Sequence, residues 1–347
     1  MPFSFLRYTM RLSFTIAVLA SAQHSSPALA EHVEAPVELL YAPGNMLVAG
    51  TVVEINPSGR LVFERGDVLG GKGRPPEKID VRVPKRVLDS AKPGERYIFG
   101  YSLARADARD PTRVVANPNG AVLISSIGLD PALFKDTPAA RELLKAGRSE
   151  HGRESRRFFD LLMKGFASGD RSLQMLAAGE IALEPEIGER IGASDRALIE
   201  KVARDAHTFP DVRASLLQSA SERPAELGDW WQATSTDVVT TSPLDGYADE
   251  ASDPAGLILL ALEVLDKHAV KVAPDALKRW LGSSRTPLVE RACLMLRRES
   301  PVLERSAINA ALADSRLPDP TRKFLNDHLR RLDLMESRVK ARKGGAD

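Results

Sequence analysis

The chain has 347 residues, a formal net charge of +1 and a single cysteine. This length gives room for two domains, each with its own core. A content of 43% hydrophobic and 27% charged residues is that of an ordered globular protein rather than a disordered one. The near-zero charge disfavours a general nucleic-acid binder, which needs a strong basic excess. One cysteine excludes an intrachain disulfide.

Residues 1–30 have the pattern of a secretory signal peptide. Arg7 and Arg11 give a positive start, residues 12–22 form a short apolar run, and residues 28–30 (ALA) offer small side chains for cleavage. An uncleaved anchor is disfavoured, because this run is too short to span about 30 Å of hydrocarbon. Cleavage removes two arginines and no acidic residue, so the net charge of +1 becomes −1. We expect a mature chain that begins at Glu31 and carries no integral membrane span.

The single cysteine bears on the compartment. An exported chain without disulfides is more typical of a bacterial periplasmic or secreted protein than of a eukaryotic extracellular module. Cys293 shares one helical face with Val289, Ala292 and Leu296. This pattern indicates a small buried side chain rather than a reactive thiol.

A polar lead-in over residues 31–45 is followed by a strand pattern. Residues 46–55 and 60–64 flank the turn 56–59 (NPSG). Residues 78–83 alternate between charged and apolar side chains, and Tyr97, Phe99 and Tyr101 share one face of the segment 96–102. Residues 113–116 and 121–126 are expected to form a last hairpin. Short antiparallel strands joined by turns predict a small barrel or sandwich.

Five segments then suggest a known domain type: residues 48–53 (VAGTVV), 60–63 (RLVF), 67–71 (DVLGG), 79–81 (IDV) and 93–99 (PGERYIF). Their order resembles the OB-like barrel of netrin-type and metalloproteinase-inhibitor (TIMP-like) domains. The resemblance covers about the first third of the mature chain and implies a small OB-like barrel. Those inhibitors insert an N-terminal cysteine into a metal site, and this chain has no cysteine there. The resemblance therefore does not imply inhibition.

Beyond the strands the apolar period becomes helical. Helix starts led by proline or aspartate recur at positions 171, 211, 254, 287 and 320, with spacings of 40, 43, 33 and 33 residues. Such spacings are typical of stacked helix pairs and resemble HEAT-type α-solenoids. A compact irregular helical bundle is the alternative. The expected pairs are 154–166 with 171–183, 195–204 with 211–221, a poorly defined region around Trp230 with 254–266, 275–281 with 287–298, and 301–312 with 320–335.

These patterns predict a multidomain α+β protein with a small antiparallel β-barrel followed by an α-solenoid. The expected boundaries are a signal peptide over 1–30, a lead-in over 31–45 and an OB-like β-barrel over 46–128. A linker over 129–150, a HEAT-like helical repeat domain over 151–336 and a basic tail over 337–347 complete the chain.

A binding site is predicted in residues 229–253, the longest segment without a clear period. It contains Trp230, Trp231 and Tyr247, although aromatic residues make up only 5% of the chain. Large rigid aromatic side chains concentrate contact energy at protein interfaces, so these three residues are candidate anchors for a partner. The alternative is that a tryptophan fills the helical core at this point.

Catalytic signals are weak. The sequence lacks both H-E-x-x-H and G-x-S-x-G, and His328 on an apolar helix face indicates a core histidine rather than a base. We therefore predict no catalytic residue, no metal site and no cofactor. The expected function is an exported scaffold that binds a protein partner and not nucleic acid. The alternatives are an inhibitor-like or enzyme-regulating module that acts through the barrel, and a hydrolase whose residues meet only in the fold.

Overall fold

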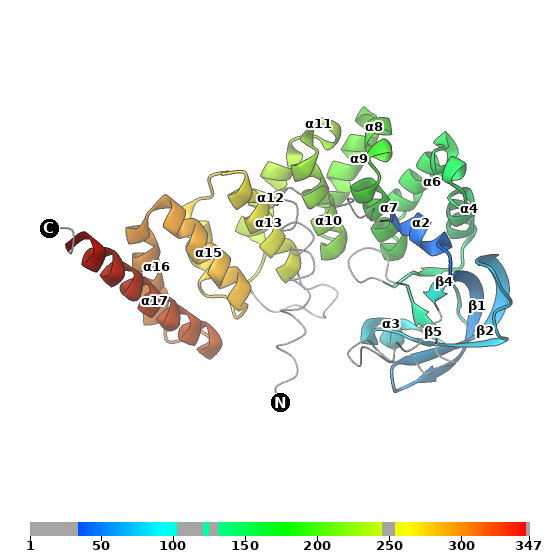
Figure 1. The fold of residues 1–347 in the computed structure, drawn as a ribbon, viewed down its shortest axis with the longest axis horizontal. Coiled ribbons are helices and arrows are strands. Elements are labelled where there is room, and N and C mark those ends of the chain that lie inside the picture. The colour runs from blue at the N-terminus through cyan, green and yellow to red at the C-terminus, as the bar shows by residue number, and fades with distance from the viewer. Residues whose placement is uncertain (1–33, 103–120, 125–130, 245–253, 345–347) are drawn as a thin grey trace. The chain divides into compact units, whose positions relative to one another are not determined.

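The computed structural model describes residues 34–102, 121–124, 131–244 and 254–344 (Figure 1). It confirms a mixed α+β protein, with a largely antiparallel sheet followed by many helices. The chain divides into two compact units, residues 1–158 and 159–347. Among the described residues, no helix has both the length and the apolar content needed to cross a membrane.

The first unit is built on a six-stranded sheet with the order β1-β2-β3-β5-β4-β6, in which β1 also pairs with β4. All its pairs are antiparallel except β3 with β5. β5 is joined to β3 and to β4 by two residue pairs each. The strands are β1 (Asn45–Asn56), β2 (Arg60–Gly70), β3 (Lys78–Arg82), β4 (Arg96–Ser102), β5 (Ala121–Leu123) and β6 (Leu133–Lys135).

Local sequence explains the β1–β2 hairpin. Gly59 adopts a φ of 88° and its amide donates to the Asn56 carbonyl at 3.0 Å, which closes the predicted turn. Gly50 is needed because β1 packs tightly against β2 there, and a Cβ would lie 2.9 Å from the Glu64 carbonyl oxygen. The alternation predicted for β3 is confirmed, since Ile79 and Val81 are buried while Lys78 and Arg82 are exposed.

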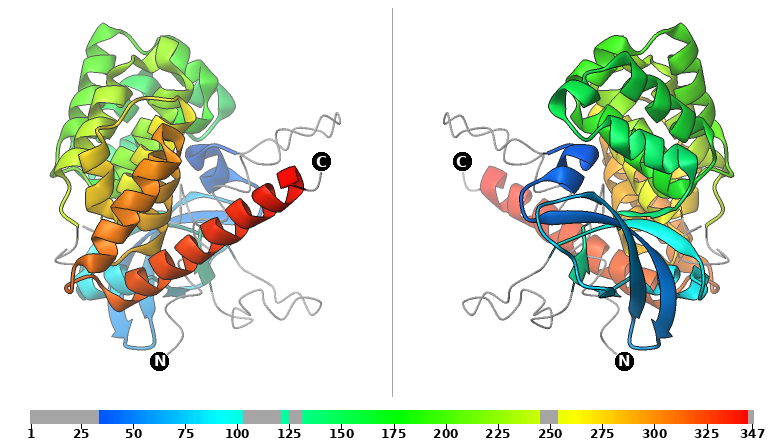
Figure 2. Two further views of the ribbon diagram at one scale, coloured as in Figure 1. Left: turned by 90° about the vertical axis from the view of Figure 1, so that its left-hand side faces the viewer. Right: turned by 90° about the vertical axis from the view of Figure 1, so that its right-hand side faces the viewer.

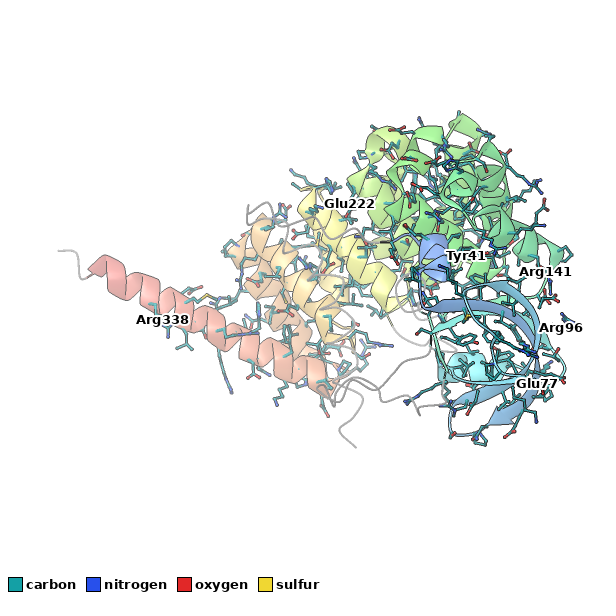
Figure 3. The ribbon with its side chains drawn as sticks, turned by 45° about the vertical axis from the view of Figure 1, so that its right-hand side comes forward. Tyr41, Glu77, Arg96, Arg141, Glu222 and Arg338 are labelled. Atoms are coloured by element: carbon teal, nitrogen blue, oxygen red, sulfur yellow. The ribbon has the colours of Figure 1, made fainter. Side chains whose placement is uncertain are left out.

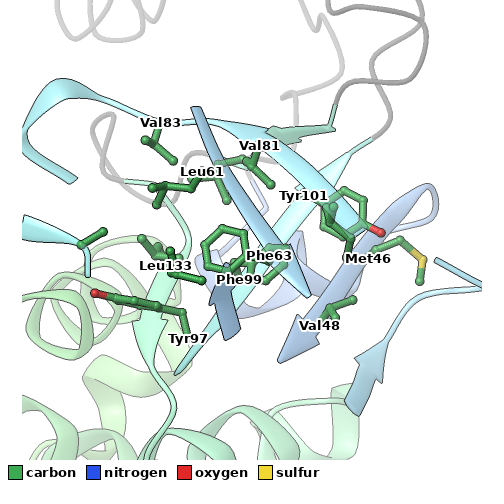
Figure 4. Packing of buried hydrophobic residues seen from close by; sticks show 14 residues of the cluster. Met46, Val48, Leu61, Phe63, Val81, Val83, Tyr97, Phe99, Tyr101 and Leu133 are labelled. Atoms are coloured by element: carbon green, nitrogen blue, oxygen red, sulfur yellow. The ribbon is translucent and has the colours of Figure 1, made fainter. Parts of the chain in front are cut away.

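Aromatic side chains fill the core of this unit (Figure 4). The rings of Phe63 and Phe99 stack with centroids 4.3 Å apart, and Tyr97 meets Phe63 edge to face at 6.2 Å. Tyr97, Phe99 and Tyr101 all belong to the buried cluster, which confirms the face predicted for β4. The β1–β2 hairpin and the strand β4 thus supply most of the large core side chains.

Short helices accompany the sheet, and the sequence pattern did not predict them. They are α2 (Pro36–Tyr41), α3 (Lys85–Ser90), α4 (Pro138–Ala146) and α5 (Glu150–Arg153). The predicted lead-in therefore contains α2, and the predicted linker over 129–150 contains β6 and α4. Of the predicted last hairpin, residues 121–123 form β5, while residues 113–116 lie outside the described residues.

Helices make up the second unit. Most of them lie close to the bounds predicted for the pairs, whereas two short helices over residues 185–190 and 224–227 were not predicted. The helices of this unit are α6 (Arg156–Ala167), which begins before the division at 158, α7 (Arg171–Leu183), α8 (Pro185–Arg190), α9 (Ala193–Arg204), α10 (Pro210–Glu222), α11 (Pro224–Leu227), α12 (Trp230–Thr241), α13 (Ala255–Lys267), α14 (Pro274–Trp280), α15 (Thr286–Glu299), α16 (Pro301–Ala313) and α17 (Asp319–Gly344). Helix α12 occupies part of the segment for which no period was predicted, and α17 extends through residues predicted as a basic tail.

Contacts between helices run in chain order along this unit. The second helix of each pair packs on the second helix of the next, in the series α7, α10, α13, α15 and α17. The first helices α9, α12 and α14 also pack on one another in that order. Figure 2 shows the successive helices of this unit in green, yellow, orange and red. Each pair is therefore covered mainly by its neighbours in sequence.

Candidate functional site

The predicted tryptophan anchors are buried. Trp230 and Trp231 begin α12 and are only 8% and 3% exposed. The indole nitrogen of Trp230 donates to the Leu227 carbonyl at 2.7 Å, and the Trp231 ring lies against the His268 ring with centroids 4.7 Å apart. Both side chains therefore lie in the helical core. An anchor for a partner needs an accessible ring, so their burial favours the alternative in which they fill the core. Tyr247, the third predicted residue, lies outside the described residues.

Helix α12 also holds two buried polar atoms that have no hydrogen-bond partner within the described structure. They are Trp231 Nε1 and Ser235 Oγ, which lie one helical turn apart in sequence. By contrast, the Thr234 hydroxyl of the same helix donates to the Trp230 carbonyl at 2.9 Å. Burial of a polar group without a partner costs free energy, so these two atoms reduce the stability that α12 contributes.

A cluster that sequence reasoning missed lies among the last three helices. Cys293 comes from α15, Glu304 from α16 and His328 from α17, and all three side chains are buried. One ligand-type atom of each lies within 4.8 Å of the others. No other such group of three occurs in the described residues. Burial of Cys293 and His328 was predicted from their helical faces and is confirmed, but their proximity was not foreseen.

Electrostatic pairing explains how the buried Glu304 carboxylate is tolerated. Arg297, one turn after Cys293 on α15, donates from Nε to Glu304 Oε2 at 2.7 Å and from Nη2 to Oε1 at 3.1 Å. His328 Nε2 lies 2.8 Å from the same Oε1. Such a bidentate pair offsets the cost of removing the carboxylate from water. Loss of Arg297 would leave that charge without its counter-ion.

The chemistry open to the Cys293 thiol is limited by its surroundings. Burial, with the nearby Glu304 charge, raises the pKa of this thiol to about 12. The thiolate is the reactive nucleophile, so a thiol protonated at neutral pH and fully buried is not an activated one. The three residues nevertheless supply sulfur, nitrogen and oxygen donors of the kinds that bind zinc.

Two charged networks lie on the first unit. Asp136 follows β6, and its carboxylate accepts hydrogen bonds from Arg141 of α4 and from Arg96 of β4; Figure 3 labels both arginines. These hydrogen bonds, that of Arg141 first, hold the pKa of Asp136 below its usual range. The network joins the start of α4 to the edge of the sheet, which indicates a structural role.

The second network contains Glu95, Tyr97 and Lys135. The Tyr97 hydroxyl donates to Glu95 Oε2 at 2.6 Å, and Lys135 Nζ donates to the Tyr97 hydroxyl at 2.8 Å. The bonds from Tyr97 and Lys135 lower the pKa of Glu95 to about 2, while burial raises the pKa of Tyr97. A tyrosine with a raised pKa is a poor acid, so this group also has the character of a structural network.

Comparison with known proteins supplies no family. No family model matches the chain, and no curated protein or solved structure matches it either, so its function is inferred from its own residues.

Proposed function

We propose that this chain is an exported protein-interaction scaffold, in which an OB-like barrel precedes a HEAT-like array of helix pairs. The observation that carries the proposal is the series of second helices, α7, α10, α13, α15 and α17, each packed on the next. Repeat arrays in which each unit contacts its neighbours offer a long surface to a partner. A scaffold uses such a surface for binding and needs no chemistry of its own.

Recurrent arginine contacts support a repeated helix-pair geometry. In the pair α9–α10, Arg213 donates to the carbonyl of Ala203, ten residues earlier, at 2.8 Å. In the pair α16–α17, Arg322 donates to the carbonyl of Leu312, also ten residues earlier, at 2.8 Å. Each arginine lies in the first turns of a second helix and reaches the end of the first. The same device at two places in the chain is expected of related helix pairs.

Ion pairs between successive second helices also support the array. Arg171 of α7 pairs with Asp211 of α10. Further along, Arg291 of α15 pairs with Glu263 of α13 at 2.8 Å. Both pairs are partly buried, which makes them less screened by water than fully exposed pairs. They favour a fixed angle between neighbouring helix pairs.

The strand pairings support the OB-like part of the proposal. They run from β1 through β2, β3, β5 and β4, and β4 pairs with β1 over Asn45–Thr51 and Arg96–Ser102. Helix α3 lies in the chain between β3 and β4. This order is the one expected of a five-stranded barrel of the OB type, with β6 added at the side of β4.

Exposed apolar side chains favour the last three helices as the partner-binding face. Four of the seven large hydrophobic residues that are exposed in the described structure lie on α15, α16 or α17. Val302, at the start of α16, is 78% exposed. The other three are Leu294, Leu334 and Met335, and the remaining exposed residues are Val53, Val68 and Leu183. Contiguous exposed apolar patches are typical of binding surfaces, and we propose that these four residues belong to one such patch.

The partner-binding proposal can be tested by capture from the exported fraction of the native cell. The baits are the mature chain, the double variant Val302→Asp/Leu334→Asp, and the control Val53→Asp on β1. We expect the wild-type chain and the control to retain the same protein, and the double variant to lose it, because charges disrupt an apolar interface. Equal retention by all three baits would contradict the assignment to the last three helices.

Export is tested separately by mass spectrometry of the protein recovered from outside the cytoplasm. The proposed signal peptide predicts a mature N-terminus at Glu31. Recovery of the chain with Met1 intact in that fraction would contradict cleavage.

A further inference from the structure

The buried cluster on α15, α16 and α17 has a composition that the scaffold function does not use. Cys293, Glu304 and His328 come from three successive helices, and their donor atoms lie within 4.8 Å of one another. All three are buried, so the donors face one another away from bulk water. We propose that these three residues form a binding site for a zinc-type divalent metal ion.

The donor set fits such an ion. Zinc binds thiolate at about 2.3 Å, imidazole at about 2.0–2.1 Å and carboxylate at about 2.0–2.2 Å, which places tetrahedral donors about 3.3–3.8 Å apart. The observed limit of 4.8 Å is slightly wider, and the 2.8 Å between His328 Nε2 and Glu304 Oε1 is slightly narrower. Side-chain shifts of about 1 Å therefore form the site. Thiolate and imidazole select zinc-type ions over calcium or magnesium, which prefer oxygen donors alone.

Charge balance assigns a part to Arg297. Without the ion, its guanidinium is the cation that balances Glu304 through two hydrogen bonds. When the ion binds, the Cys293 thiol releases its proton to solvent, and the thiolate and the carboxylate together neutralise the two positive charges. Arg297 then becomes an excess charge. Its side chain is 31% exposed, so it can turn toward water as the ion enters.

The consequence of binding would be a link between three helices. Helix α15 packs on α16 and α17, and α16 packs on α17. An ion bound by one donor from each helix adds a direct bond among them. Because the ion binds the folded state, it stabilises that state in proportion to the logarithm of its concentration over its dissociation constant.

The test uses the untagged mature chain and its variants, dialysed against Zn²⁺ and then analysed for bound metal. Co²⁺ serves as a second probe, because a bound thiolate gives a charge-transfer absorption. We expect one ion per wild-type chain, a thiolate–Co²⁺ band, and a rise in melting temperature with added Zn²⁺. Cys293→Ser and His328→Ala should bind at least about tenfold more weakly, and Cys293→Ser should lack the band.

Arg297→Gln distinguishes a metal site from a purely structural ion pair. Removal of the competing cation should make Zn²⁺ binding tighter than in the wild type, and Zn²⁺ should restore the melting temperature that the substitution lowers. His207→Ala, which removes an exposed imidazole elsewhere, is the control and should bind as the wild type does. Absence of stoichiometric Zn²⁺ from both the wild type and Arg297→Gln would overturn the proposal. Binding that is unchanged in Cys293→Ser would overturn it equally.

Discussion

The indole nitrogens of the three tryptophans differ in their hydrogen bonding, although all three rings are buried. Trp230 Nε1 donates to the Leu227 carbonyl at 2.7 Å and Trp280 Nε1 to the Val239 carbonyl at 2.9 Å. Trp231 Nε1 has no partner among the described residues. At the residue scale, substitution of these tryptophans can therefore separate the effect of losing a hydrogen bond from the effect of losing packing.

Replacement of each tryptophan by phenylalanine should show that difference. Each change removes similar volume, but Trp230→Phe and Trp280→Phe also leave a carbonyl without its donor. We expect them to cost about 1–2 kcal/mol more than Trp231→Phe. Trp231→Ala should cost about 3–5 kcal/mol, as expected for a core residue. Chemical denaturation measures each free energy of unfolding. A Trp231→Ala variant as stable as the wild type would contradict its placement in the core.

The carboxylates of the first unit predict how its stability depends on pH. The pKa of Glu95 is lowered to about 2, and that of Asp136 lies below its usual range. A carboxylate whose pKa is lower in the folded state stabilises the fold above its unfolded-state value of about 4, and this contribution is lost as pH falls through the folded-state value. We therefore expect the melting temperature of this unit to fall between about pH 4 and pH 2.

Circular dichroism of the sheet, followed during heating at a series of pH values, measures this effect. Glu95→Gln and Asp136→Asn should each melt lower at neutral pH and show a shallower dependence on pH below about 4. The melting temperature of each variant should depend less steeply on pH because each substitution removes one group that gains a proton on unfolding. An unchanged slope in both variants would rule out these networks as its source.

The cluster of Cys293, Glu304 and His328 shows where sequence reasoning fails at the residue scale. Helical periodicity places Cys293 and His328 on buried faces, because each has apolar neighbours at three and four positions along the helix. It gives no distance between residues of different helices. The three residues lie on separate helices, so no single spacing reveals them, and their proximity depends on how α15, α16 and α17 pack.

At the scale of elements, helix ends offer a matched pair of tests. Ala269 follows α13 with a φ of 54°, the only positive value at a non-glycine residue among those described. The Val270 amide donates to the Leu265 carbonyl at 2.9 Å, as in a Schellman motif. Gly169, before α7, has a φ of 75°, and a Cβ there would meet no atom within 4 Å. A substitution at either site therefore tests the backbone conformation, and an alanine at position 169 would do so without a steric clash.

We expect opposite changes in stability at these two sites. Ala269→Gly should stabilise the second unit by about 1 kcal/mol, because glycine adopts a left-handed conformation without the strain that alanine carries. Gly169→Ala should destabilise it by about 1–2 kcal/mol for the same reason. Urea denaturation of both variants provides the measurement. Changes of the same sign at both sites would contradict this account.

The predicted elements were reliable where a period was long and bounded. α7 was predicted at its observed ends, and α10 and α16 within one residue of theirs. Helix α12 was missed because its valines and its many threonines, all β-branched, disfavour a helix. In the structure the threonine hydroxyls donate to carbonyls of the preceding turn, as Thr236 does to Gln232 at 2.8 Å. α3 and β6, with six and three residues, are too short to show any period.

At the scale of the whole molecule, the division near residue 158 predicts an independently stable helical fragment. A fragment of residues 155–347 keeps α6 whole and includes the Ser155 hydroxyl, which accepts from the Phe158 amide at 3.1 Å. We expect it to be helical by circular dichroism and to melt cooperatively, because its buried residues form their own core. A fragment without a cooperative transition would show that the two units depend on one another for folding.

The distribution of tryptophan gives the molecule an optical label for one of its two units. Trp230, Trp231 and Trp280 are the only tryptophans in the sequence, and all lie beyond residue 158. Tryptophan fluorescence therefore follows the refolding rate of the helical unit, while the circular dichroism of the sheet follows that of the first unit. The hydrogen bonds within helices join residues that are close in sequence. By contrast, β1 pairs with β4 through residues that are far apart in sequence, such as Asn45 and Ser102. Since rates fall as contacting residues lie farther apart in sequence, the fluorescence signal should recover before the sheet does.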